Sequence, residues 1–124
     1  MNGRNFLIDT NIALYLLSGN DTIAQLLEGS IVHLSFITEL ELLGYHGITK
    51  QEQHRIRLFL KDCLIHNISS DIKELSIDIR QRNRLKLPDS IIAATALQLE
   101  IPFISADSGF KKIPNLSLLF FEVT

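Results

Sequence analysis

The 124 residues of the chain, 46% of them hydrophobic, predict one globular domain, residues 1–124, with a substantial core and little room for a second domain. The formal net charge of -2 lacks the basic excess typical of nucleic-acid-binding proteins, and the single cysteine, Cys63, excludes an internal disulfide. The apolar runs are too short to span a bilayer and the amino terminus does not resemble a signal peptide, so we expect a cytoplasmic protein.

Strand and helix patterns alternate along the first half of the chain. In order, we expect a strand at residues 6–8, helices at about 10–18 and 20–28, a strand at 31–36, and helices at about 38–43 and 49–62. Thr38 and Glu41 have the spacing of a capping box, as do Thr49 and Glu52. Each pair is therefore expected to open a helix.

The second half continues this alternation. We expect a strand at 64–68, a long helix that follows Ser69 and carries the basic residues, a buried helix at 89–99, and strands at 103–105 and 118–121. Pro88 suits the first position of the buried helix, where its missing N–H costs nothing. Strands that alternate with helices predict an α/β fold, with a parallel sheet and helices on both faces.

Acidic residues stand where this fold brings strand ends together. Asp9 directly follows the first strand, Asp107 follows the fourth, and Glu41 is expected in the first turn of the helix after the second. Parallel strands would gather these three at one edge of the sheet. Asp89 would join them, because the short link between its helix and the fourth strand requires the helix to run antiparallel to that strand.

Carboxylates gathered in this way repel one another unless a cation lies among them. An oxygen-only set without histidine or cysteine suits Mg²⁺ or Mn²⁺, and the matching reaction is metal-assisted hydrolysis of a phosphodiester. Each acid also has a structural interpretation, as a helix cap or as a negative charge near a helix dipole. Taken alone, Asp9 is better explained as a cap.

Four motifs, in this order and at this spacing, cover almost the whole chain. They are LIDTN at residues 7–11, ITELEL at 37–42, LPDSIIAATA at 87–96 and ISAD at 104–107. Together they resemble the motifs of PIN-domain ribonucleases, and among these the VapC-type toxins of bacterial toxin–antitoxin pairs. One departure is Gly109 before Phe110, where family members often carry Asp, and it affects only a supporting contact.

The resemblance implies a single PIN-like domain whose parallel five-stranded sheet has the order 3-2-1-4-5. It implies a magnesium- or manganese-dependent endoribonuclease with Asp9, Glu41, Asp89 and Asp107 as the catalytic metal site. Asn11 and Ser105 would support that site. It also implies a small antitoxin as partner and a homodimer, which agrees with a mean hydropathy of +0.19, high for a lone soluble domain.

A short basic run precedes the third motif. It consists of Arg80, Arg82, Arg84 and Lys86. Its position beside Asp89 favours contact with the RNA backbone, whereas a solvated helix face is the general interpretation of such a run.

Two other classes of protein remain open. One is a non-catalytic interaction module that kept the fold, in which the acids are only caps. The other is a receiver-like phosphoryl-transfer domain, which would need a lysine near the acidic site. Lys111 and Lys112 are the late candidates for that lysine.

Overall fold

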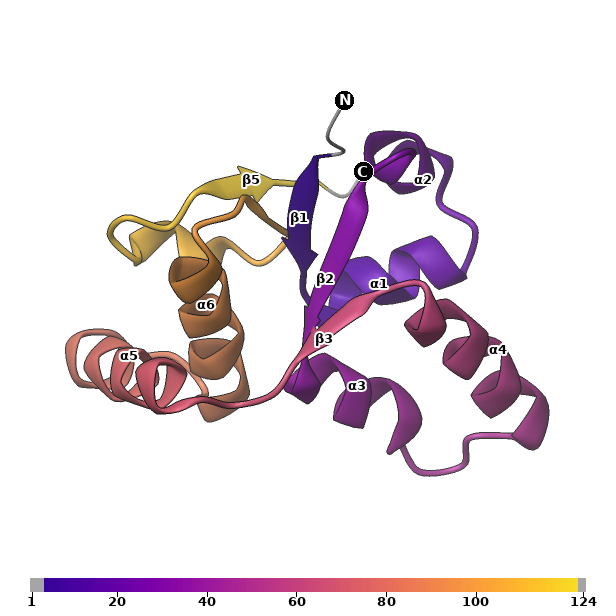
Figure 1. The fold of residues 1–124 in the computed structure, drawn as a ribbon, viewed down its shortest axis with the longest axis horizontal. Coiled ribbons are helices and arrows are strands. Elements are labelled where there is room, and N and C mark those ends of the chain that lie inside the picture. Colours follow the sequence, from indigo (N-terminus) through magenta and orange to yellow (C-terminus); the bar gives the residue numbers. More distant parts are fainter. Residues whose placement is uncertain (1–3, 123–124) are drawn as a thin grey trace.

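A five-stranded parallel sheet forms the centre of the computed structural model, which describes residues 4–122 (Figure 1). The strands are β1 (Asn5–Ile8), β2 (Ile31–Ser35), β3 (Leu64–His66), β4 (Phe103–Ser105) and β5 (Leu118–Phe120). Their order is β3-β2-β1-β4-β5, and all four neighbouring pairs are parallel. The predicted parallel sheet and its strand order are therefore confirmed.

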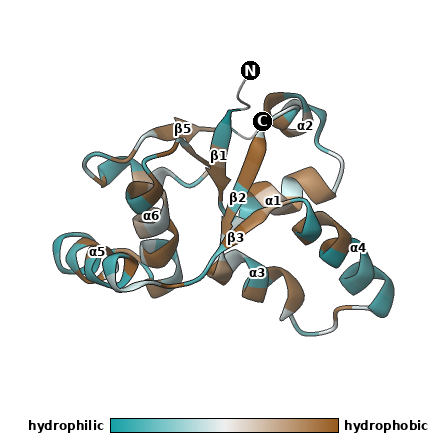
Figure 2. Cartoon of the chain, in the orientation of Figure 1, coloured by the Kyte–Doolittle hydropathy of each residue, from teal (hydrophilic) through white to brown (hydrophobic). Residues whose placement is uncertain are grey.

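Helices cover both faces of the sheet, and a separate hydrophobic core lies on each face. They are α1 (Thr10–Leu17), α2 (Asp21–Leu27), α3 (Phe36–Leu43), α4 (Lys50–Lys61), α5 (Ser70–Arg82), α6 (Leu87–Leu99) and the 3-10 helix η1 (Ser108–Lys112). The first core joins the sheet to α1, α2 and α4, and the second joins it to α5 and α6 (Figure 1). In Figure 2 the strands β2 and β3 are largely hydrophobic, whereas α4 and α5 carry extensive hydrophilic stretches. None of the helices within residues 4–122 is long and apolar enough to cross a membrane.

Helix α6 is the buried helix that the sequence predicts. Every residue from 90 to 96 is buried, because α6 lies between the sheet and α5. Its two buried hydroxyls are each satisfied by a backbone carbonyl one turn earlier: Ser90 donates to the carbonyl of Lys86, and Thr95 donates to the carbonyl of Ile91. The helix begins at Leu87. Pro88 therefore occupies its second position, whereas the sequence predicted the first. This placement leaves Asp89 in the first turn.

Helix α3 begins earlier than predicted. Strand β2 ends at Ser35, and the Ser35 hydroxyl caps the helix by accepting a hydrogen bond of 3.1 Å from the N–H of Ile37. Thr38 therefore lies inside the helix, fully buried, and the predicted capping box of Thr38 and Glu41 is wrong. Glu41 lies in the second turn of α3 and not in the first.

The capping box at Thr49 and Glu52 is confirmed. Both of its reciprocal hydrogen bonds, from the Glu52 N–H to the Thr49 hydroxyl and from the Thr49 N–H to the Glu52 carboxylate, are 3.1 Å long. The basic run, by contrast, is not carried on one helix. Helix α5 ends at Arg82 because Asn83 takes an extended conformation, so Arg84 lies in the link and Lys86 directly precedes α6.

Two histidines that are far apart in the sequence meet across neighbouring strands. The Nδ1 atom of His33 and the Nε2 atom of His66 lie 2.8 Å apart, and the two rings are stacked. The other ring nitrogen of His33 lies 2.8 Å from the side-chain oxygen of Asn5. Burial lowers the pKa of both imidazoles, which favours the neutral forms near pH 7.

Candidate metal centre

The acidic residues singled out by the sequence line one cavity at the carboxyl edge of the sheet. This cavity has a volume of about 170 Å³, and its lining residues are Asp9, Thr10, Asn11, Glu41, Asp89, Ile92 and Asp107. It lies where β1 and β4 are neighbours, which is the topological switch point of the strand order. The fold therefore brings all four acids together, and their binding of a metal remains a prediction.

Asp9 is both a helix cap and part of this cavity. Its Oδ1 atom accepts a 3.0 Å hydrogen bond from the N–H of Ile12 and so caps α1. Its Oδ2 atom accepts a 2.6 Å hydrogen bond from the hydroxyl of Ser105, at the end of β4. Burial raises the pKa of Asp9, although these two hydrogen bonds oppose the shift, and the charges of Asp107 and Glu41 raise it further. The structural and functional interpretations of Asp9 are thus compatible.

Glu41 enters the cavity from α3 and is held by a residue of α1. The hydroxyl of Thr10 donates a 2.5 Å hydrogen bond to Oε1 of Glu41 and lies 3.1 Å from the hydroxyl of Thr38. Glu39, two residues earlier on the same helix, does not line the cavity. Of these two glutamates, Glu41 is therefore the one that α3 contributes to the cavity. The role of Thr10 was missed from the sequence, although Thr10 lies within the first motif.

Asp107 and Asp89 complete the ring of acids. Asp107 caps η1 by accepting a 2.8 Å hydrogen bond from the N–H of Gly109, and its own N–H donates to Ser105. Asp89 lies in the first turn of α6. Partial burial raises the pKa of Asp89, and the nearby acids Asp107, Glu41 and Asp9 raise it further, while Lys86 opposes the shift. Burial and the neighbouring acids therefore make the ionised form of Asp89 less favourable.

The donor set fits a hydrated Mg²⁺ or Mn²⁺ ion. Among residues 4–122, no three side chains of histidine, cysteine, aspartate or glutamate lie close enough to hold one ion directly. This spacing is expected of carboxylates that repel one another without a cation. Mg²⁺ usually keeps several waters and binds through one or two carboxylates, so a ring of separated carboxylates around a small polar cavity suits it.

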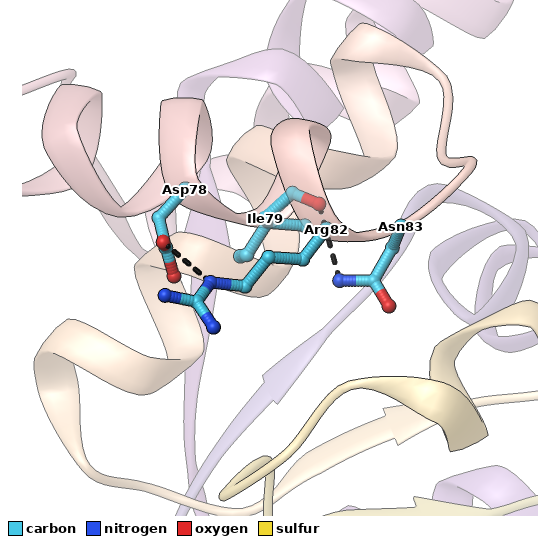
Figure 3. A network of polar contacts seen from close by, with 4 residues as sticks. All are labelled: Asp78, Ile79, Arg82 and Asn83. Atoms are coloured by element: carbon cyan, nitrogen blue, oxygen red, sulfur yellow. Dashed lines mark hydrogen bonds and ion pairs between the residues drawn. The ribbon is translucent and has the colours of Figure 1, made fainter.

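The residues of the basic run lie in different surroundings. Arg82 forms an ion pair of 2.8 Å with Asp78 on the exposed side of α5 (Figure 3). It lines a separate cavity of about 550 Å³, between α5, the end of α6 and residues 113–115, that contains none of the four acids. Lys86 is the member whose charge acts on Asp89. Of the four basic residues, Lys86 is therefore the one associated with the acidic cavity.

Neither lysine of the receiver-like alternative lies in the acidic cavity. The Nζ atom of Lys111 lies 3.9 Å from the centre of the Phe120 ring. Lys112 donates to the backbone carbonyl of Arg84. Because neither side chain lines the cavity, the structure offers no support for that alternative.

This fold and this site define a class of protein: a doubly wound α/β domain with an acidic cavity at the switch point of its sheet. The model of the PIN domain matches residues 6–116, and the chain belongs to the PIN domain family. A comparison with curated proteins gave no match.

Solved structures support the same assignment. The chain is 37% identical to one in a toxin–antitoxin complex from Klebsiella pneumoniae, with a TM-score of 0.81 over 94% of this chain and 98% of that chain. It is 25% identical to a chain in VapBC-1 from nontypeable Haemophilus influenzae, with a TM-score of 0.76 over 94% and 97% of the two chains. A chain in VapBC2 from Rickettsia felis is 22% identical and shares the fold, with a TM-score of 0.83 over 95% and 99%. The resemblance to VapC-type members of the family is thereby confirmed.

The first prediction concerns Asp89 in the metal-free protein. The pKa of Asp89 in the folded protein lies above its ordinary value of 3.8, so ionising Asp89 is less favourable in the folded state than in the unfolded chain. The folded state therefore loses stability as the pH rises from 3.8 through the folded-state pKa. Above both values the full loss of stability applies. Asp89→Asn removes this penalty. We expect it to raise the melting temperature at pH 7 in EDTA, and we expect the gain to shrink as the pH falls toward 4.

Asp71 is the matched control because it lies in the first turn of α5 and outside the cavity. Asp71→Asn removes a favourable charge near a helix N-terminus, which typically costs about 0.3 to 1 kcal/mol, and its amide oxygen can still accept the 3.3 Å hydrogen bond that Gln98 donates to Asp71. If Asp89→Asn lowered the melting temperature as much as Asp71→Asn does, Asp89 would be an ordinary helix-terminal charge.

Proposed function

We propose that the protein is a magnesium- or manganese-dependent endoribonuclease that serves as the toxin of a toxin–antitoxin pair in the cytoplasm. The observation that carries this proposal is that Asp9, Glu41, Asp89 and Asp107 line one small cavity at the carboxyl edge of the sheet. Membership of the PIN domain family supports a nuclease function. The similar chain from a Klebsiella pneumoniae toxin–antitoxin complex supports the biological role.

The four acids would hold the cation, with Asn11 in the same cavity lining and Ser105 donating a hydrogen bond to Asp9. The bound cation supplies a lowered pKa for an attacking water and neutralises charge on the phosphate oxygens. Three of the acids are already oriented by a hydrogen bond: Ser105 donates to Asp9, Thr10 donates to Glu41, and the N–H of Gly109 donates to Asp107. Such preorientation reduces the conformational entropy that would be lost when the cation and the phosphate bind.

The second prediction tests the chemistry. RNA cleavage should require Mg²⁺ or Mn²⁺ and stop in EDTA, since the described residues that line the cavity supply carboxylates for a cation but no histidine or lysine for metal-free cleavage. Asp9→Asn and Glu41→Gln should each lower kcat by at least about 100-fold, the lower end of what a positioned catalytic group contributes. Cleavage can be followed on a defined set of RNAs.

Glu39→Gln is the control for this experiment because Glu39 shares α3 with Glu41 and lies outside the cavity. It should leave cleavage unchanged. Full activity in EDTA, from protein free of contaminating nuclease, would contradict the proposed function.

The third prediction concerns the binding of RNA by the basic residues. We propose Arg80, Arg82, Arg84 and Lys86 as contacts for the RNA backbone, with the largest effect at Lys86. Lys86→Ala should raise KM and reduce the slope of log affinity against log salt by about 0.7 to 1, the value for one lost phosphate contact. Arg82→Ala should change that slope less, because Arg82 is already paired with Asp78. Equal slopes for Lys86→Ala and the wild type would assign Lys86 to the solvent.

The fourth prediction concerns the antitoxin. We propose a small partner that inserts a basic side chain and an apolar segment at the acidic cavity, where a positive group offsets the carboxylate repulsion as a cation does. Partner and cation should therefore compete, and excess Mn²⁺ should weaken the affinity of the antitoxin measured by calorimetry. An affinity that is unchanged by Mn²⁺ would exclude occlusion of the metal site.

A homodimer completes the proposal. Large hydrophobic side chains remain exposed on several elements of the described chain, including Leu40, Leu58, Leu64, Ile77 and Leu87. These side chains are available for contact with a protein partner, and a second copy of the chain is the partner that the family resemblance implies.

A further inference from the structure

Two threonines connect α1 to α3 beside the cavity. Thr38 is fully buried in the first turn of α3, and its hydroxyl lies 3.1 Å from the hydroxyl of Thr10. The Thr10 hydroxyl in turn lies 2.5 Å from Oε1 of Glu41. The three polar groups therefore form a chain that runs from the protein interior to the cavity.

The chemistry of the groups determines the direction of the hydrogen bonds. An ionised carboxylate only accepts, so the single proton of the Thr10 hydroxyl is donated to Glu41. The Thr10 oxygen is then free to accept, and the buried Thr38 hydroxyl donates to it. Each hydroxyl is thereby satisfied, and the hydrogen bond to the charged group is the stronger kind.

The position of Glu41 explains why such a chain matters. Glu41 is exposed in the second turn of α3, and its long side chain would otherwise sample many rotamers. The contact with Thr10 orients one carboxylate oxygen and leaves Oε2 without a partner among the hydrogen bonds of the described residues. A carboxylate held in this way loses less conformational entropy when it binds a cation.

We propose that Thr10 and Thr38 are positioning residues that orient Glu41 for the cation, with Thr10 acting directly and Thr38 acting through Thr10. This inference rests on the metal site of the proposed function. It predicts that removal of either hydroxyl weakens cation binding even though neither hydroxyl needs to contact the cation.

The test measures the dissociation constant of the full chain for Mn²⁺ by calorimetry. Thr10→Val keeps the shape of the side chain and removes its hydroxyl, and it should weaken Mn²⁺ binding by roughly 10-fold or more, as is typical when the hydrogen-bond partner of a metal ligand is lost. Thr38→Val should weaken binding by a smaller factor. Thr10→Ser keeps the hydroxyl that Thr10→Val removes, and it should bind Mn²⁺ with wild-type affinity.

Thr95→Val is the matched control, because it also removes a buried threonine hydroxyl, one that donates only to the carbonyl of Ile91. It should leave the Mn²⁺ affinity unchanged. Thermal melts of each variant identify any that fails to fold. In that case Thr10→Ala, at a partly exposed position, carries the same test.

A double-mutant cycle isolates the connection to Glu41. In a Glu41→Gln background, Thr10→Val should have no further effect on Mn²⁺ affinity, because the carboxylate that it orients is gone. Equal losses in both backgrounds, or wild-type affinity in folded Thr10→Val, would overturn the inference. A wild-type protein that binds Mn²⁺ without cleaving RNA would contradict the proposed nuclease while this test of Thr10 remains valid. A wild type that binds no Mn²⁺ would overturn both.

Discussion

The hydrogen bond from Ser105 to Asp9 connects the ends of β4 and β1, and the acidic site depends on it. It is 2.6 Å long and buried, and it joins residues that are 96 positions apart in the sequence. Asp9 also caps α1, and Ser105 also accepts the N–H of Asp107. One buried contact therefore fixes the start of α1, the end of β4 and the direction in which Asp107 leaves the sheet.

Around this contact the cavity concentrates negative charge that the metal-free protein does not favour. Burial and mutual repulsion raise the pKa values of Asp9 and Asp89, and hydrogen bonds to Asp9 only partly offset the shift. A site that is electrostatically unfavourable when empty gains more from a bound cation or a cationic side chain. The same physical property thus links the proposed metal dependence to the proposed binding of a partner's basic side chain at the cavity.

Local patterns predicted most of the elements, and they failed where two good local signals competed. Thr38 and Glu41 have the spacing of a capping box, but Ser35 stands at the end of β2 and caps α3 first. The basic run likewise reads as one helical segment, whereas the extended Asn83 ends α5 at Arg82 and separates Lys86 from it. Capping residues only a few positions apart differ little in local free energy, so tertiary packing selects between them.

The sequence by itself determined the alternation of strands and helices, the buried character of α6 and the identity of the acids that follow the strand ends. Its motifs, through their resemblance to a family, also implied the strand order that the structure confirms. Only the tertiary structure decided that Thr10 holds Glu41, that Ser105 holds Asp9, and that His33 meets His66. These contacts join residues 28 or more positions apart, counting the link between Thr10 and Thr38, and they depend on the register of paired strands and the packing of helices on them. Local sequence carries periodicity and capping preference, but it contains no information about which distant side chains the pairing of strands brings within hydrogen-bonding distance.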